Sequence, residues 1–405
     1  MTPNTAAQPL LTHQPHDGAE ASDWVAWYWS DLLPAWVERA RDPDGPGYFD
    51  LLDETGQPDL ARKSVLAQAR LLFTFSHLAL LSGNPAHLAA AAVAHDALAA
   101  FRKPSGLYRR CVTQSGQPTG NAEDDYATSY DQSFIILGLS TWGKLHPSEQ
   151  TDPALEAIWC AIETTLIDPA TGLLLEHDSL DDPADNAAPA RAQNPHMHLY
   201  EATLQAFEMT QNAVWLERAK TMRAKGLEFF FDTDSGTITE FIAPDLSILP
   251  GRAGQRREIG HQCEWAWLLL REVDLGGNPD MAAVAARLLA FADDHGFAQG
   301  GVMQGLAFDA VSADADWRED RFLLWPQTEA LKTYAVRATD KIHADNARRL
   351  TLSMFRHYFA DRTAFVNHLD DTGAVLWPDA LSRLHYHVVL ALTEGARAGL
   401  WATPT

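Results

Sequence analysis

A repeat of nearly constant length is the feature that most constrains the fold of this chain. Polar or aromatic residues recur near the start of every second helical segment, and successive ones are 60, 68, 63, 64 and 62 residues apart. These anchors are Arg70, Tyr130, His198, His261, Trp325 and His387. Such a period is typical of a repeated supersecondary unit. Since two helices and their loops fill one period, we expect six helix pairs.

The apolar pattern agrees with this expectation. Apolar residues recur at helical spacing in about twelve segments, and no strand–helix alternation indicates a parallel sheet. The expected helices are 22–40, 62–83, 86–102, 126–145, 152–166, 196–210, 213–230, 257–275, 279–296, 325–338, 341–360 and 383–398. We therefore predict an all-α (α/α)6 barrel whose even-numbered helices form the inner ring. Their N-terminal turns would converge on one pocket, where helix dipoles favour oxygen-rich ligands. An open helical solenoid is the alternative.

The segments between the helices predict short β-hairpins and one domain. Residues 47–58, 106–118 and 364–375 each combine a β-branched or aromatic run with a polar turn containing Gly, which is typical of a hairpin. Residues 1–21 are polar and lack periodicity, so we expect a mobile arm there. No linker interrupts the chain between residues 22 and 398, and we expect a single catalytic domain over 22–405.

Charge and cysteine content exclude several classes of partner and site. Among 405 residues, 31 Lys and Arg face 54 Asp and Glu, a formal net charge of −23, which argues against nucleic acid and membrane surfaces. Three scattered cysteines suit neither a disulfide framework nor a cysteine zinc site. The sequence has no basic N-terminal region and no uncharged run of membrane length, so we expect a cytoplasmic protein. We also expect it to be a monomer or a small homo-oligomer.

Histidines at matching repeat positions are the main candidates for chemistry. In NPHMHLYEA, His198 and Glu201 are three residues apart on one helix face, and GHQCEWAW repeats this with His261 and Glu264. LHYHVVLAL adds His387. A carboxylate one turn away can fix an imidazole tautomer, and histidine is well suited to exchange protons at neutral pH. A catalytic metal is the alternative, but the His-x-x-Glu order is the reverse of that in helical di-metal sites. We predict no metal and no cofactor.

Other polar residues could bind a sugar. Tyr130 and Trp325 could stack on a sugar ring, and Arg70 lies in an otherwise apolar helix, where it needs an anionic or oxygen partner. Asp131 and Glu329 could serve an inverting glycosidase. The acidic run 123–125 is expected to be a solvated loop, although it offers carboxylates for the same purpose.

Seven motifs in order resemble one known family. They are LPAWVERARDPDGPGYFDLLDETG, QARLLFTFS, YDQSF, NPHMHLYEA, GHQCEWAWLLL, WPQTEALK and YHVVLAL. From about residue 24 to 398 the chain resembles the N-acylglucosamine 2-epimerase superfamily, whose fold is the (α/α)6 barrel. Its members interconvert sugars at C1 and C2 without a metal or nucleotide cofactor in the reaction. GHQCEW resembles the GHQFEW of the mannose isomerase and sulfoquinovose isomerase branch, with Cys263 in place of Phe.

The resemblance implies a division of roles. His387 would move a proton between C2 and C1 of the sugar, and His261, oriented by Glu264, would open the ring. His198 and Arg70 would hold substrate oxygens. The sugar site would be shaped by Tyr130, Asp131, Glu201, Trp325 and Glu329.

The expected reaction is the interconversion of D-mannose and D-fructose through a cis-enediol. A sugar 2-epimerase shares this intermediate and stays open, and an inverting glycosidase and a noncatalytic sugar-binding barrel are further alternatives. The expected partner is a monosaccharide. Arg252, Arg256 and Arg257 precede His261, and we expect them on a loop surface rather than against an anionic substituent.

Overall fold

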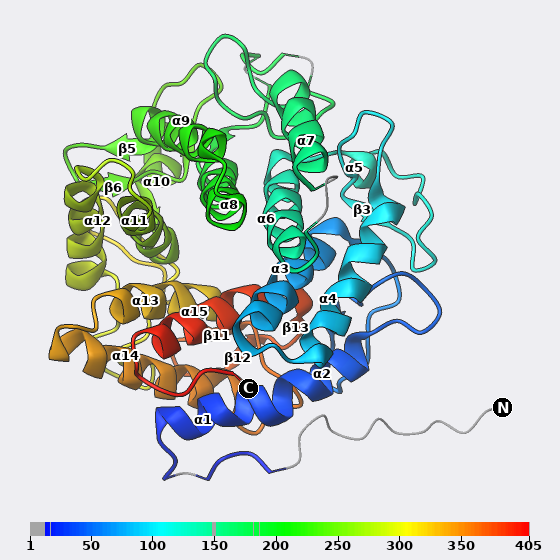
Figure 1. Cartoon of the computed structure of the whole chain (residues 1–405). Coiled ribbons are helices and arrows are strands. Elements are labelled where there is room, and N and C mark those ends of the chain that lie inside the picture. Colours follow the sequence, from blue (N-terminus) through cyan, green and yellow to red (C-terminus); the bar gives the residue numbers. More distant parts are fainter. Residues whose placement is uncertain (1–12, 17, 148–150, 181, 186, 405) are drawn as a thin grey trace.

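Six helices form an inner ring in the computed structural model, which describes residues 13–16, 18–147, 151–180, 182–185 and 187–404. Neighbouring helices in the ring pack on each other, and the last packs on the first (Figure 1). The inner helices are α3 (Val65–Ser82), α6 (Ser129–Leu145), α8 (Asn194–Thr210), α11 (Ile259–Asp274), α13 (Leu324–Val336) and α15 (His385–Arg397). The (α/α)6 barrel prediction is therefore confirmed, and the open solenoid is wrong.

An outer layer covers this ring, one helical element for each inner helix (Figure 1). Five of its elements are α4 (Pro85–Ala97), α7 (Thr151–Thr165), α9 (Ala213–Phe230), α12 (Met281–His295) and α14 (Lys341–Met354), which continues into the π-helical η3 (Phe355–Phe359). The sixth is the continuous run of α1 (Ala21–Trp27), η1 (Tyr28–Leu32) and α2 (Leu33–Ala40). Short helical turns in the loops are η2 (Leu98–Phe101), α5 (Ala122–Asp125), α10 (Gly251–Gln255) and η4 (Ser382–Leu384).

Short antiparallel strand pairs tie the loops together at the N-terminal ends of the inner helices. Five inner helices follow a strand that pairs with a strand of another loop: β2 (Lys63–Ser64) with β3 (Cys111–Val112), β4 (Arg191–Ala192) with β7 (Phe241–Ile242), β8 (Arg256–Glu258) with β9 (Ala310–Ser312), β10 (Arg321–Leu323) with β11 (His368–Asp370), and β13 (Ala380–Leu381) with β1 (Leu51–Leu52). Before α6, a bridge joins Thr128 to His177. The strands therefore fix the rim from which the inner helices begin.

Two of the three predicted hairpins pair within themselves. β11 pairs with β12 (Val375–Trp377) in the 364–375 region, and an antiparallel bridge joins Leu52 to Pro58 in 47–58. A further hairpin joins β5 (Phe231–Asp232) to β6 (Thr237–Ile238). In 106–118 the turn is present, but β3 pairs with the distant β2, so the prediction of a local hairpin was wrong there.

A recurring polar side chain explains the sequence period. In four inner helices a buried glutamine amide bonds both the N–H and the C=O of one residue in a preceding loop, at 2.7–2.9 Å. The four are Gln68, Gln132, Gln262 and Gln327, with partners Tyr48, Tyr108, Ile238 and Ala307. In α8 the same place is held by His196, whose Nε2 accepts from the Leu174 N–H at 2.8 Å. His196 is therefore bonded to a loop backbone as these glutamines are.

Part of the predicted N-terminal arm is fixed on the barrel. Residues 1–12 and 17 lie outside the described residues. The Gln14 amide, however, donates to the Phe359 carbonyl and accepts from the Asp361 N–H, and Ala19 is buried. This part therefore packs beside η3, and the mobility of the arm stays a prediction.

One described helix is long and apolar enough to cross a membrane by length and composition, namely α3. It is an inner helix of the barrel, with most of its residues buried.

Candidate active site

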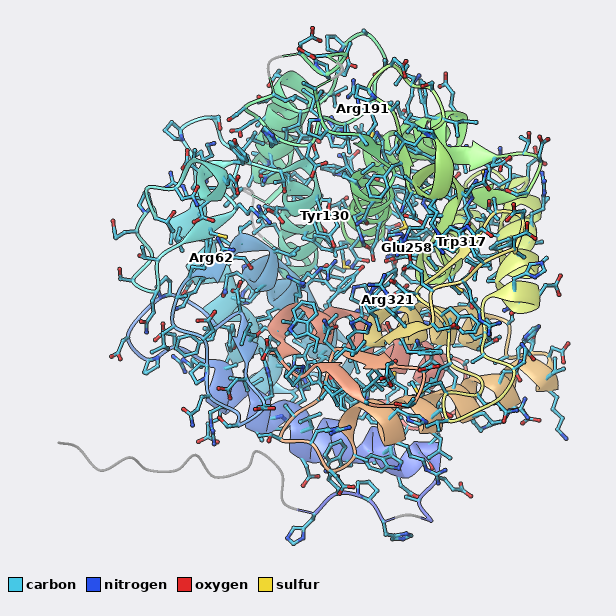
Figure 2. All side chains as sticks on the ribbon, turned by 180° about the vertical axis from the view of Figure 1, so that it is seen from behind. Arg62, Tyr130, Arg191, Glu258, Trp317 and Arg321 are labelled. Carbon is cyan, nitrogen blue, oxygen red and sulfur yellow. The ribbon has the colours of Figure 1, made fainter. Side chains whose placement is uncertain are left out.

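The N-terminal ends of the inner helices surround a pocket of about 760 Å³. In Figure 2 the labelled Tyr130 and Glu258 lie toward the middle of the ring, whereas Arg62 lies farther out. Of the ten site residues predicted from the sequence, eight line this pocket: Arg70, Tyr130, Asp131, His198, His261, Glu264, Trp325 and His387. Glu201 and Glu329 do not line it, and they bond to histidines instead.

His387, from α15, connects a buried carboxylate to an arginine of the pocket. Its Nδ1 lies 2.7 Å from Glu329 Oε1, and its Nε2 lies 3.2 Å from Arg70 Nη1. A guanidinium can only donate, so Nε2 accepts and Nδ1 carries the proton. Burial, then the charges of Arg70 and Lys332, lower the pKa of His387 well below its usual value. His387 is therefore a neutral imidazole with its lone pair on Nε2.

Arg70 is held in place by aromatic groups. Its Nη2 donates to the Tyr130 hydroxyl at 2.6 Å, and its Cζ lies 4.2 Å from the Phe134 ring centre and 4.8 Å from that of Tyr386. Cation–π contacts of this kind stabilise a desolvated guanidinium. Arg70 thus presents a fixed positive charge beside His387.

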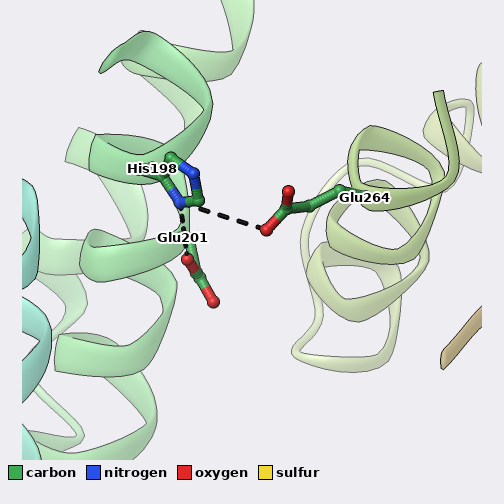
Figure 3. Close-up of side chains that lie close together, drawn as sticks. All are labelled: His198, Glu201 and Glu264. Carbon is green, nitrogen blue, oxygen red and sulfur yellow. Dashed lines mark hydrogen bonds and ion pairs between the residues drawn. The ribbon is translucent and has the colours of Figure 1, made fainter. Parts of the chain in front are cut away.

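His198, from α8, is oriented by the carboxylate one turn later. Its Nδ1 donates to Glu201 Oε2 at 3.1 Å, and Glu264 of the facing helix α11 lies 4.0 Å from the same nitrogen (Figure 3). The Tyr386 hydroxyl donates to Glu201 at 2.5 Å. Burial alone would raise the pKa of Glu201, but the hydrogen bond and charge of His198 lower it below its usual value. Glu201 therefore positions His198 and does not itself line the pocket.

His261, from α11, is paired with two carboxylates that the sequence analysis missed. Its Nδ1 donates to Glu240 Oε2 at 2.7 Å and lies 3.2 Å from Glu258 Oε2. Burial opposes protonation, but the charges of Glu240 and Glu258 outweigh it and raise the pKa of His261 to about 10. The prediction that Glu264 orients His261 was wrong, because the i+3 carboxylate lies beside His198 instead.

Trp325, at the start of α13, packs against His261 and His387. Its ring centre lies 4.8 Å from that of His261 and 6.0 Å from that of His387. The ring sits where Gly260 leaves room, since a Cβ on Gly260 would lie 2.2 Å from it. Asp131 also lines the pocket, and burial raises its pKa to about 6.

Two expectations about nearby charges were wrong in part, although Arg252, Glu123 and Asp125 are exposed as expected. Arg257 is not on a loop surface: it is buried in β8 and bonds Thr237 and Asp232. Within the acidic run 123–125, Asp124 is buried against Arg62 at 2.6 Å rather than solvated. In each case an ion pair compensates the buried charge.

Three overlapping groups among the described residues have the donor types of a metal site. They are His198–Glu201–Glu264, Glu240–Glu258–His261 and Glu264–Glu329–His387, each with its donor atoms within 4.8 Å of one another. A lysine ammonium competes with a metal in the third group, because Lys332 Nζ lies 2.5 Å from Glu329 and 3.9 Å from Glu264. The absence of a metal stays a prediction.

Comparisons with known proteins agree with the fold. The model of the N-acylglucosamine 2-epimerase (GlcNAc 2-epimerase) family matches residues 47–396. A mannose-6-phosphate isomerase of Rhizobium meliloti (strain 1021) is 27% identical over 77% of this chain and 78% of its own. A D-mannose isomerase structure superposes with a TM-score of 0.75 at 21% identity, covering 90% of this chain and 97% of its own. A cellobiose 2-epimerase structure from Bacillus thermoamylovorans B4167 has a TM-score of 0.78 at 16% identity, covering 90% and 95%.

Proposed function

The chain belongs to the N-acylglucosamine 2-epimerase family, and from this premise we propose that it is an aldose–ketose isomerase acting on D-mannose and D-fructose. The family and the relatives support a sugar isomerase or epimerase. The Rhizobium relative and one structural neighbour are named for mannose isomerisation, and the GHQCEW motif resembles that branch.

The observation that carries the proposal is the opposite charge surroundings of two imidazoles facing one pocket: carboxylates flank His261, and Arg70 donates to Nε2 of His387. His261, with a pKa raised to about 10, is an imidazolium at neutral pH, and His387, with a lowered pKa, is a neutral base. Two titratable groups whose surroundings push their pKa values apart are suited to acid and base roles.

The proposed steps give each group one role. His261 donates a proton to the ring oxygen as the C1–O5 bond breaks, and it takes the O1 proton as the C1 carbonyl forms. His387 Nε2 then removes the proton on C2, the C2–H electrons form the C1–C2 double bond, and His261 returns its proton to O1 to give the enediol. Arg70 and the His198 imidazole stabilise charge on O1 and O2. His261 then takes the O2 proton, the carbonyl forms at C2, and His387 returns its proton to C1, which restores both histidines.

A 2-epimerase is the second candidate. The protonated His261 shares the pocket with His387 and could supply a proton to the opposite face of C2. The glycosidase alternative is weaker, because Asp131 lines the pocket whereas Glu329 bonds His387 instead.

A panel of free sugars incubated in D₂O tests the proposal. The panel is D-mannose, mannose 6-phosphate, D-glucose, cellobiose and N-acetylglucosamine, with products separated by chromatography and labels located by NMR. We expect fructose from mannose with deuterium only at C1, together with partial internal transfer of the original proton by the single base. C2-deuterated glucose formed before fructose would replace the isomerase with the epimerase, and products from the 6-phosphate alone would change the substrate.

A further inference from the structure

Lys332 is a buried cation that the steps above do not use. It lies one turn after Glu329 on α13 and its side chain is fully buried. Its Nζ is 2.5 Å from Glu329 Oε2, 3.9 Å from Glu264 Oε1 and 4.1 Å from the Trp267 ring centre. A lysine is almost never fully buried unless it is paired, so its charge needs this carboxylate group.

Glu329 links this lysine to the proposed base. Its Oε2 faces the Lys332 ammonium and its Oε1 faces His387 Nδ1 at 2.7 Å, so both of its neighbours are donors. An N–H donor at one oxygen and an ammonium at the other favour the ionised form of the acid, which has only acceptors. Because Arg70 also donates to His387 Nε2, a continuous row runs from Lys332 through Glu329 and His387 to Arg70.

Neighbouring helices bring charges to Glu329. Burial, followed by the like charges of Glu264 of α11 and Glu201 of α8, raises the pKa of Glu329. Lys332 opposes that rise through its charge and its contact. Beside Glu329, which accepts from its Nδ1, His387 faces four cationic or basic groups: Arg70, Lys332, His198 and His261. Lys332 is therefore the cation in contact with Glu329 that holds it ionised among like charges.

We propose that Lys332 is a positioning residue that keeps Glu329 a carboxylate and thereby holds His387 in the tautomer with an unprotonated Nε2, which accepts from Arg70. Without the ammonium, Glu329 takes a proton from solvent and becomes an acid whose O–H donates to Nδ1. The imidazole proton then moves to Nε2, which displaces the Arg70 hydrogen bond and blocks removal of the C2 proton. The effect on turnover rests on the proposed function, whereas the effect on the tautomer does not.

The tautomer is measured directly by ¹⁵N NMR of the histidine rings in the full-length protein, with His387 assigned by its absence in His387→Gln. In wild type we expect the Nε2 resonance of His387 in the region of a bare nitrogen. In Lys332→Met it moves to the N–H region. A folded Lys332→Met protein in which Nε2 stays bare overturns the proposal. Should that variant not fold, Lys332→Gln, which keeps a donor without the charge, is judged by the same criterion.

A matched control is available in Lys63, which is equally buried and paired with Asp42 at 2.5 Å but contacts none of the three histidines of the pocket. Lys63→Met loses a buried ion pair of the same kind, and the His387 resonances stay as in wild type. A shift of the tautomer in Lys63→Met as well would assign the effect to general destabilisation and overturn the proposal.

A double-mutant cycle separates positioning from packing. With the sugar that the panel identifies, Lys332→Met lowers kcat by about 10²-fold or more, in line with loss of a general base, and changes KM less than threefold. Glu329→Gln has a similar effect, and the double variant is no slower than Glu329→Gln, because both changes act through one carboxylate. If the two losses of kcat add in the double variant, Lys332 and Glu329 do not act through the same carboxylate, and the proposal is refuted. If wild type converts no sugar, the proposed function fails while the NMR result still decides the role of Lys332.

Discussion

Replacing Glu240 with glutamine should give His261, the proposed proton donor, the pKa of an ordinary histidine. The pKa of His261 rises from 6.5 to about 10, which corresponds to about 5 kcal/mol in favour of the imidazolium. If burial costs about 4 kcal/mol, the carboxylates together supply about 9 kcal/mol. The Coulomb energy varies inversely with distance, so Glu240 at 2.7 Å supplies slightly more than half, and Glu258 at 3.2 Å supplies about 4 kcal/mol.

Without Glu240, the attraction of Glu258 therefore only balances the cost of burial. The pKa of His261 returns to about 6.5, and about 3% of the enzyme retains the protonated imidazole at pH 8. We expect kcat/KM of Glu240→Gln to be about 30-fold below wild type at pH 8 and less than twofold below it at pH 6. The isosteric amide keeps an acceptor for the Glu258 N–H, which Glu240 Oε1 binds at 2.9 Å.

The assay is the pH dependence of kcat/KM between pH 5.5 and 10, which reports groups of the free enzyme. Asp309→Asn is the control, since Asp309 is buried nearby and bonds Arg256 but does not contact His261. The fall of its kcat/KM at high pH should occur near the same pH as in wild type. The raised pKa also stabilises the fold below about pH 6.5, and this contribution is lost as the pH rises through about 10. The melting temperature of wild type should therefore fall as the pH rises through about 10, and that of Glu240→Gln should not show this fall. A folded Glu240→Gln protein with an unmoved basic limb would refute the role of His261 as the acid.

Three further outcomes are expected. His387→Asn should lower kcat by about 10²–10⁴-fold, with sugar binding retained in calorimetry; activity near wild type would remove it as the base. Exhaustive chelation should leave the rate unchanged, because the Lys332 ammonium supplies positive charge among the carboxylates, and loss restored by Mn²⁺ or Zn²⁺ would contradict this. Gly260→Ala places a methyl group 2.2 Å from the Trp325 ring and should lower kcat/KM at least about tenfold with altered tryptophan fluorescence, whereas Gly300→Ala, with open space around it, should change neither.

The helical layout could be predicted because each unit must bury one helix and bond its loop in the same way. Gln68, Gln132, His196, Gln262 and Gln327 are 64, 64, 66 and 65 residues apart for that reason. The strand pairing could not be predicted. A strand of two residues has no periodicity, and Leu381 finds its partner at Leu51, at the other end of the chain.

The site was predictable where partners are local. His198 and Glu201 lie on one helix and were visible as a pair, but the same i+3 rule assigned Glu264 to His261 and failed. The true partner of His261 is Glu240, 21 residues earlier and in a different element. Spacing on a helix tells which side chains share a face, and it does not tell which neighbouring element supplies a closer charge.

Closure of the ring by α15 against α3 ties the pocket to the course of protein synthesis. Arg70 and His387 are 317 residues apart and meet only when the last inner helix is in place. At about 5–20 residues per second on the ribosome, Arg70 emerges about 15–60 seconds before its partner. During that interval the ring of inner helices is incomplete, so the apolar side of α3 is uncovered. The proposed base, His387, is also missing. A polypeptide that stalls before α15 is thus inactive and offers a surface for aggregation or for a chaperone.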